Sequence, residues 1–326
     1  MPRSRPVLLP ALVVAAFLLV PLGAAWGPSG SGGSPIHRAE HFLDVGDGAT
    51  LHVVERWSDA SLAREPRRAI LMVTATLVTE AQWDSDVPGD PTFNSLDLAA
   101  EQGFFAYAAT TEGYGQSSHP ADGRTVTAER ILREMGVVLE WARARSGAEK
   151  VDLLGSSLGS SIAFALGGAA SPVDPSHVGK VVLTSHIYRQ PTVLLQVLLA
   201  TLGCGPVPPP PPDGYMDTLV AQYAIILWNS EPLAQLWAYQ TFPGHYAMGP
   251  TSEGCDFPVF TAEQGRAPVM VFWGDHDLLA SLPDLEQFCA EYGGPCSITQ
   301  VPGMGHAPNF EATRHVFWED VWEFLG

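Results

Sequence analysis

Residues 151–161 read VDLLGSSLGSS, a short apolar run that stops at a glycine and continues into serines and a second glycine. The run Val151–Leu154 is typical of a buried strand, and the small residues after it predict a helix packed close to that strand. Gly155, Ser157 and Gly159 form the pattern G-x-S-x-G, in which the serine lies at the apex of a sharp turn from strand to helix. Side chains two residues either side of that serine would collide, so both places require glycine. The alternative is a tight glycine turn that only packs the helix against the strand.

The chemistry of a serine hydroxyl sets what else the sequence must provide. The hydroxyl is a weak nucleophile, so it needs a base within about 3 Å and donors for the oxyanion that develops. Around this kind of turn, an acid and then a histidine follow the serine in the chain, each after a later strand. VMVFWGDHDLL offers Asp277 or Asp275 as the acid, and VPGMGHAPNFE offers His306 as the base. Two other histidines are weaker candidates: His276 and His186.

The remaining sequence alternates predicted strands with predicted helices. A hairpin is expected at Asp47-Gly48. Apolar runs predict strands at 67–76, 103–110, 150–154, 180–185, 268–274 and 296–303. Helical spacing predicts helices at 91–102, 125–147, 158–170, 284–294 and 314–325. This order implies an α/β fold with a mostly parallel sheet flanked by helices, folded from residue 36 to 326. Residues 187–262 break the order and are interpreted as an inserted cap over the carboxyl edge of the sheet.

The N-terminus has the pattern of a secretory signal. Arg3 and Arg5 precede an apolar stretch from Val7 to Val20, and small residues follow up to Ala25. We therefore interpret residues 1–25 as a signal peptide and residues 26–35 as a linker. The alternative is an uncleaved membrane anchor, because the apolar stretch is almost long enough to span a bilayer. Either interpretation places the body of the protein outside the cytoplasm, secreted or periplasmic.

The cysteine count fits an exported protein. Four cysteines allow three pairings, and pairing of neighbours is the simplest, giving Cys204–Cys255 and Cys289–Cys296. The alternative is four buried free thiols. No CxxC motif or His/Cys cluster suggests a metal site.

The charge excludes one class of partner. The formal net charge is −18 over 326 residues, so the surface repels nucleic acids and anionic lipid headgroups. No nucleic-acid partner is expected, and no obligatory membrane partner beyond the possible N-terminal anchor.

From about Phe42 onward, leaving out the cap, the sequence resembles the α/β-hydrolase superfamily. The motifs that carry the resemblance are GSSLG, WGDHD, GMGH and TTEGYGQSS, the last at residues 110–118. In that family the acid usually lies three residues after the glycine of W-G-x-x-D, which implies Asp277, with Asp275 as the alternative. The same resemblance implies His306 as the general base. A serine at the turn argues against haloalkane dehalogenase and epoxide hydrolase chemistry, which use a carboxylate there.

The resemblance also implies the two oxyanion donors. The first is the backbone N–H of Leu158, directly after the serine. The family usually carries His-Gly before the second donor, whereas this chain has Thr74 and Ala75. A backbone N–H needs no particular side chain, so Thr76 is the expected second donor, with Leu77 as the alternative.

These expectations combine into an exported serine hydrolase that cleaves a carboxylic ester through an acyl-enzyme, without a metal or organic cofactor. Ser157 attacks the carbonyl, His306 transfers the proton, and Asp277 orients His306. The expected substrate is a small-molecule or lipid-like ester. Two alternatives stay open: a peptidase or amidase that uses the same three residues, and a catalytically silent binding module.

Overall fold

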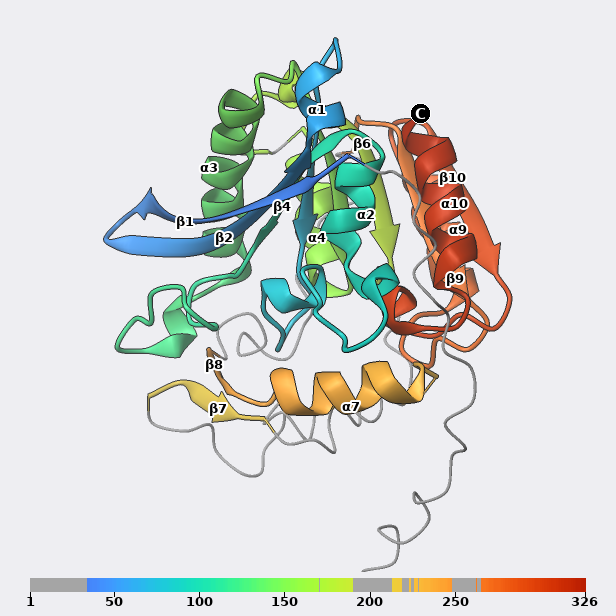
Figure 1. Cartoon of the computed structure of the whole chain (residues 1–326). Helices are drawn as coiled ribbons and strands as arrows, with labels where there is room; N and C mark the ends of the chain where they lie inside the picture. Colours follow the sequence, from blue (N-terminus) through green and yellow to red (C-terminus); the bar gives the residue numbers. More distant parts are fainter. Residues whose placement is uncertain are drawn as a thin grey trace, which may run out of the picture. The chain divides into compact units, whose positions relative to one another are not determined.

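An eight-stranded sheet forms the centre of the structure, a computed structural model that describes residues 34–169, 171–189, 213–218, 223, 226–227, 229–247, 262 and 265–326 (Figure 1). The strand order is β1-β2-β4-β3-β5-β6-β9-β10. The strands are β1 (Ile36–Gly46), β2 (Ala49–Ser58), β3 (Arg68–Val73), β4 (Phe104–Ala109), β5 (Val151–Ser156), β6 (Val178–Thr184), β9 (Val269–Gly274) and β10 (Cys296–Val301). The β1–β2 and β2–β4 pairs are antiparallel and all other pairs are parallel, which confirms the predicted mostly parallel sheet.

Helices cover both faces of this sheet. They are α1 (Asp59–Ala63), α2 (Ser95–Glu101), α3 (Ala128–Ser146), α4 (Leu158–Leu166), α9 (Leu282–Glu291) and α10 (Arg314–Leu325). Short 3-10 turns lie at Glu80–Gln82, Pro91–Phe93, Gly123–Thr125, Pro175–His177 and Pro308–Phe310. Alternate residues of β3 point to opposite faces. Leu71 and Val73 pack with α3, α4 and α9, whereas Ile70 and Met72 pack with α2 and α10.

Local signals account for most element boundaries. Asp47 and Gly48 both have positive φ, at 52° and 76°, so they make the turn of the predicted β1–β2 hairpin. The side chain of Thr127 caps α3 by accepting from Arg130 N, and Gly147 ends it with φ 73°.

Two predicted helices are too long. The helix predicted to reach residue 170 ends at Leu166, because the next glycines turn away and Gly168 forms a β-bridge with Gly265. The helix predicted from residue 91 begins at Ser95. Pro91–Phe93 forms a separate 3-10 turn, and the side chain of Asn94 caps α2.

The described part of the insertion between β6 and β9 adds no strand to the central sheet. It contains α7 (Pro232–Thr241) and a two-stranded ribbon of β7 (Tyr215–Asp217) and β8 (His245–Ala247). Figure 1 shows these elements beyond the carboxyl ends of the parallel strands. Ala247 N donates to Gly113 O at 3.2 Å, and Glu231 N donates to Phe310 O at 2.9 Å. The insertion is therefore anchored to two loops at that edge of the sheet.

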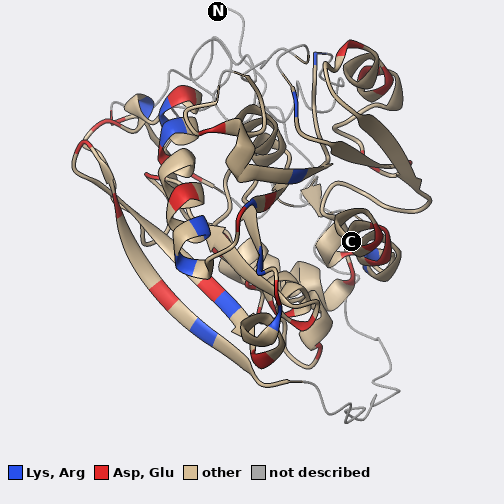
Figure 2. Cartoon of the chain, turned by 90° about the horizontal axis from the view of Figure 1, so that it is seen from above, with Lys and Arg blue, Asp and Glu red and all other residues tan. Residues whose placement is uncertain are grey.

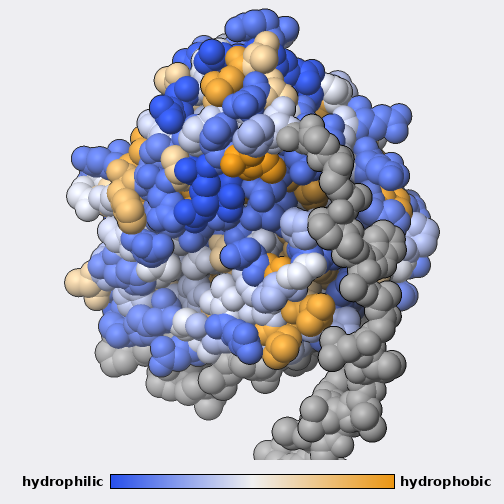
Figure 3. Space-filling view, in the orientation of Figure 1, coloured by the Kyte–Doolittle hydropathy of each residue, from blue (hydrophilic) through white to orange (hydrophobic). Residues whose placement is uncertain are grey.

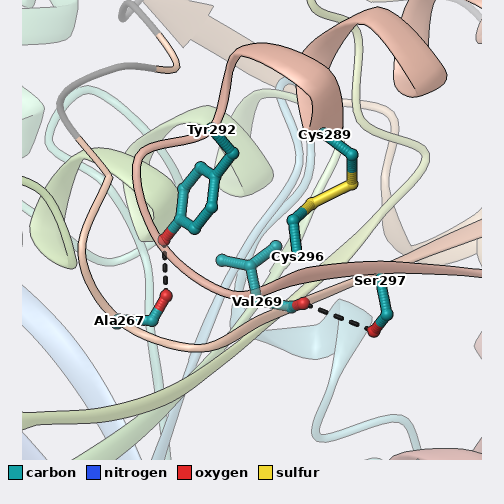
Figure 4. Close-up of a disulfide and its surroundings, with 6 residues drawn as sticks. All are labelled: Ala267, Val269, Cys289, Tyr292, Cys296 and Ser297. Atoms are coloured by element: carbon teal, nitrogen blue, oxygen red, sulfur yellow. Dashed lines mark hydrogen bonds between the residues drawn. A yellow bond between two sulfur atoms is a disulfide. The ribbon is translucent and has the colours of Figure 1, made fainter.

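One predicted disulfide lies within the described residues. Cys289 on α9 is joined to Cys296 at the start of β10, with the Cα atoms 5.4 Å apart (Figure 4). The bond ties the end of a helix to an edge strand, as the pairing of neighbours predicts. The predicted partners Cys204 and Cys255 lie outside the described residues.

The predicted signal peptide and most of the predicted linker also lie outside the described residues, which begin at Ser34. Within the described ranges, no helix combines the length and the apolar character that crossing a bilayer requires.

The surface is mostly polar. Acidic and basic side chains occur side by side along the helices and the long strands (Figure 2), and the face shown in Figure 3 is largely hydrophilic with scattered apolar patches. The large apolar side chains that are exposed among the described residues are Phe42, Leu62, Val137, Leu233, Leu236, Leu278 and Val316. Single exposed apolar residues of this kind are ordinary for a folded protein in water.

Candidate active site

Ser157 lies at the turn from β5 to α4 and has the backbone conformation that the motif predicts. Its φ is 53° and its ψ is −118°, a combination that side-chain-bearing residues rarely adopt. Such strain persists only where the surrounding structure enforces it. Among the described residues, no hydrogen-bond partner of Ser157 Oγ is present, so its hydroxyl is not committed to holding the turn.

The two glycines of the motif are required by space. A Cβ on Gly155 would lie closer than 3.0 Å to the carbonyl oxygen of Gly159, which is the predicted collision across the turn. A Cβ on Gly159 would lie equally close to the carbonyls of Val73 and Thr74. Glycine at this second place therefore also lets the start of α4 contact the end of β3. This contact brings the loop after β3 next to Ser157.

A neighbouring serine fixes the turn to the next strand. Ser160 Oγ lies 2.7 Å from each of two carbonyl oxygens, Gly155 O and Thr184 O, to which its hydroxyl can donate. Ser157 N donates to the same Thr184 O at 3.0 Å. The turn is thus held against the end of β6 by the backbone and by Ser160, while the side chain of Ser157 stays free.

Asp277 and His306 form a buried pair. Their side chains meet at 2.9 Å between Oδ1 and Nδ1, and both residues are less than a tenth exposed. Asp277 Oδ1 also accepts from the backbone N–H groups of Leu279, at 2.9 Å, and Ala280, at 3.2 Å. Because Asp277 is the acceptor in all of these contacts, Nδ1 of His306 is the protonated ring nitrogen. The other nitrogen, Nε2, is then an acceptor on the opposite side of the ring.

The charge state of Asp277 follows from the balance of these contacts. Burial alone raises the pKa of this carboxyl, but the charge and hydrogen bond of His306, with the two backbone N–H groups, outweigh burial. The net result is a pKa below its usual range. Asp277 is therefore ionised at neutral pH and can stabilise a positive charge on His306.

The structure separates Asp277 from the alternative acid. Asp275 accepts from Gly303 N at 2.6 Å, in an exposed position. It forms no described hydrogen bond to His306, so the geometry supports the acid that the family spacing implies. The other weaker candidates lie elsewhere. His276 is exposed, with Nδ1 3.4 Å from Asn229 Oδ1.

His186 lies in a buried aromatic cluster with residues of α4 and α9, on one face of the sheet. Its ring lies 4.8 Å from the ring of Phe288 and 6.4 Å from that of Phe164, measured between centroids. Burial lowers the pKa of His186 to about 3, so the residue is neutral. Neither ring nitrogen has a hydrogen-bond partner among the described residues. His186 therefore makes no hydrogen bond to Ser157, Asp277 or His306 among the described residues.

The histidine loop is held by two residues that sequence reasoning missed. Ser185 Oγ donates to His306 O at 2.7 Å. The buried carboxylate of Glu311 accepts from the N–H groups on both sides of the histidine, at Gly305 and, at 3.2 Å, at Ala307. Two sequence features could have indicated these residues. Ser185 is a short polar residue at the end of a predicted strand, and Glu311 lies inside the stretch VPGMGHAPNFE.

These contacts bring Ser157 and His306 to the same point of the sheet. Ser157 bonds to Thr184, and the adjacent Ser185 bonds to His306. No hydrogen bond joins Ser157 Oγ to His306 among the described residues. Such bonds are often long in unliganded enzymes and shorten only with substrate.

The loop after β3 holds the two expected oxyanion donors, Thr76 and Leu77. The N–H of Leu77 interacts with the hydroxyl of Tyr114, which also lies 3.2 Å from Thr76 Oγ1. The N–H of Thr76 has no acceptor among the described residues, nor does that of Leu158 at the start of α4. Thr76 therefore stays the expected second donor, with Leu77 as the alternative.

The comparisons with known proteins agree with this architecture. Residues 89–202 match the family model described as the alpha/beta hydrolase fold. No curated protein matches the sequence.

Several solved structures share the fold at low identity. A serine hydrolase from Cycloclasticus zankles is 14% identical with a TM-score of 0.64, over 88% of this chain and 98% of that one. E-2-(acetamidomethylene)succinate hydrolase is 18% identical with a TM-score of 0.63, over 89% and 99%. Carboxylesterase CesB from Bacillus subtilis is 17% identical with a TM-score of 0.62, over 88% and 91%. The family match and the shared architecture together identify the chain as a protein of the α/β-hydrolase fold.

Proposed function

We propose that this protein is an exported serine hydrolase that cleaves carboxylic esters through an acyl-enzyme. The observation that carries the proposal is the buried Asp277–His306 pair beside a strained serine turn with a free hydroxyl. A buried carboxylate bonded to Nδ1 of a histidine is the arrangement that makes Nε2 a general base. The similar structures include a serine hydrolase and a carboxylesterase, which support the same class.

The proposed reaction assigns a part to each of these residues, and His306 acts in every step. His306 Nε2 accepts the proton of Ser157 as the oxygen attacks the carbonyl, and Asp277 stabilises the imidazolium that forms. The N–H groups of Leu158 and Thr76 hold the oxyanion of the tetrahedral intermediate. His306 then donates its proton to the leaving alcohol. Water, activated by the same histidine, hydrolyses the acyl-enzyme and restores Ser157.

Export is part of the proposal. It rests on the signal pattern of residues 1–25 and on the Cys289–Cys296 disulfide, because such bonds persist mainly in oxidising compartments. N-terminal sequencing of the protein from a culture supernatant or periplasmic extract tests it. A first residue near Trp26 supports cleavage of the signal. An intact Met1 supports the membrane-anchor alternative.

The test of the chemistry uses a fluorophosphonate probe and a set of substrates. Labelling at Ser157, found by peptide mapping, supports the serine mechanism. Turnover of p-nitrophenyl esters of graded chain length is then compared with that of aminoacyl amides. Faster ester turnover supports the proposal, whereas preferred amide turnover makes the protein a peptidase or amidase. No label and no turnover make it a binding module.

A further inference from the structure

The insertion reaches the loop after β3 through one tyrosine. The hydroxyl of Tyr223 donates to Leu77 O at 2.7 Å, across 146 residues of sequence. Tyr223 is almost fully buried. Burial raises its pKa to about 12, so the hydroxyl remains a donor at any pH at which the protein works. Leu77 directly follows Thr76, the proposed oxyanion donor.

The hydroxyl of Tyr223 has two carbonyl acceptors within reach, and Leu77 O is the nearer. Tyr223 Oη also lies 3.0 Å from Phe242 O, but Tyr246 already donates its hydroxyl hydrogen to that carbonyl. Thr218 Oγ1 lies 3.0 Å from Tyr223 Oη and can donate to it. The bond to Leu77 O is therefore the shorter of the two that the hydroxyl of Tyr223 can donate.

Leu77 is a residue that needs such support. Its φ is 62°, a left-handed conformation that residues with a side chain rarely adopt. Its carbonyl accepts from Tyr223, and the hydroxyl of Tyr114 lies 3.2 Å from Thr76 Oγ1 on the preceding residue. The ring of Tyr114 packs edge-on against Tyr246 of the insertion, 4.8 Å between centroids.

We propose that Tyr223 is a positioning residue through which the insertion holds in place the loop that carries the Thr76 N–H. This inference rests on the proposed function, because it assigns the loop a part in binding the oxyanion. Tyr223 touches neither substrate nor the serine. It acts by holding Leu77, the residue directly after Thr76, and so fixes the loop that carries the proposed donor, so its loss affects the transition state more than the bound ester.

The test compares two tyrosines of the insertion that both donate to body carbonyls. Tyr223→Phe removes the bond to Leu77. The matched control Tyr215→Phe removes a bond of 2.8 Å to Pro120 O, far along the chain from Leu77. Each variant is assayed for kcat and KM with p-nitrophenyl acetate and for inhibition by phenylboronic acid, whose tetrahedral adduct places an oxygen at the oxyanion position.

We expect Tyr223→Phe to lower kcat about tenfold and to weaken phenylboronic acid about tenfold, with KM within about twofold of wild type. Tyr215→Phe should leave all three within about twofold. Equal loss of kcat in both variants would mean that Tyr223 only docks the insertion, and unchanged kcat or a rise in KM alone in Tyr223→Phe would also overturn the proposal.

A second variant covers misfolding. If circular dichroism shows that Tyr223→Phe is unfolded, the same kinetics are measured on Thr218→Val. This variant removes the hydroxyl that lies 3.0 Å from Tyr223 Oη. Unchanged kcat in that variant overturns the proposal, and a loss of about threefold supports it. A wild-type protein that neither hydrolyses the ester nor takes a fluorophosphonate label overturns the proposed function as well. An active wild type separates the two failures.

Discussion

Two serines at neighbouring strand ends share the same positive φ but differ in what their hydroxyls contact. Ser157 follows β5 and Ser185 follows β6, and both have φ 53°. Ser185 uses its hydroxyl to hold His306 O, whereas Ser157 Oγ has no described partner and is held only through its backbone. The φ angle is the same, but only the Ser157 hydroxyl is left without a described hydrogen bond.

The comparison shows what marks a reactive serine. Positive φ alone does not, because Ser185 has it without any glycine two residues away. In the proposed mechanism the turn at Ser157 also needs a helix that starts at once, so that Leu158 N–H can face the oxyanion, and space for that helix against β3, which Gly159 provides. A structural serine needs only an acceptor within reach.

The strongest way to break this comparison is to remove the free hydroxyl. Ser157→Ala should lower kcat about a millionfold, as in other enzymes with this triad, and shift the unfolding free energy by no more than about 0.5 kcal/mol. Ester turnover and a denaturant melt measure both. Ser161→Ala, on the following helix, should keep activity within about threefold. Substantial turnover by folded Ser157→Ala would show that another residue is the nucleophile.

The acid assignment is the next largest test. Asp277→Asn should lower kcat about ten-thousandfold, because an amide does not enforce the imidazole tautomer. Asp275→Asn is the matched control and should stay within about fivefold, since that carboxylate bonds only Gly303 N in an exposed position among the described contacts. Steady-state kinetics of both proteins decide between them. A larger loss in Asp275→Asn reverses the assignment.

Crowding the turn tests why its glycine matters. Gly159→Ala places a Cβ against the carbonyls of Val73 and Thr74, so the loop after β3 must shift. A displacement of this kind costs about a hundredfold in kcat and about 1–3 kcal/mol in stability. Thermal melts and kinetics together measure it. Full activity would mean that the loop after β3 does not supply an oxyanion donor.

The smallest effect belongs to the structural serine. Ser185→Ala removes the hydrogen bond to His306 O and should lower the unfolding free energy by about 1 kcal/mol, with kcat reduced about tenfold. The same denaturant melts and assays apply. A loss approaching that of Ser157→Ala would mean that the two serines do not divide the work as the comparison states.

The sequence predicted the elements whose information is local. Apolar runs located the strands, Thr127 and Gly147 delimited α3, and the glycine spacing located the turn at Ser157. Asp277 and His306 were located by their loops, and the structure brings them together. The contacts that hold the site were not predictable, because they join distant positions. Ser185 meets the residue 121 positions on, and Tyr223 meets one 146 positions back.

The first strand has a consequence for the behaviour of the protein in concentrated solution. β1 is a long outer strand that pairs only with β2 among the described strands, so its free side could template association with a second molecule. Several features oppose this. Charged side chains alternate along the strand, Arg38 pairs with Glu40, and the register shifts at Asp44/Gly46. Pairing two such edge strands would bury these charged side chains and distort the hydrogen bonds between the strands. The first strand of the fold therefore also protects the protein from edge-to-edge aggregation.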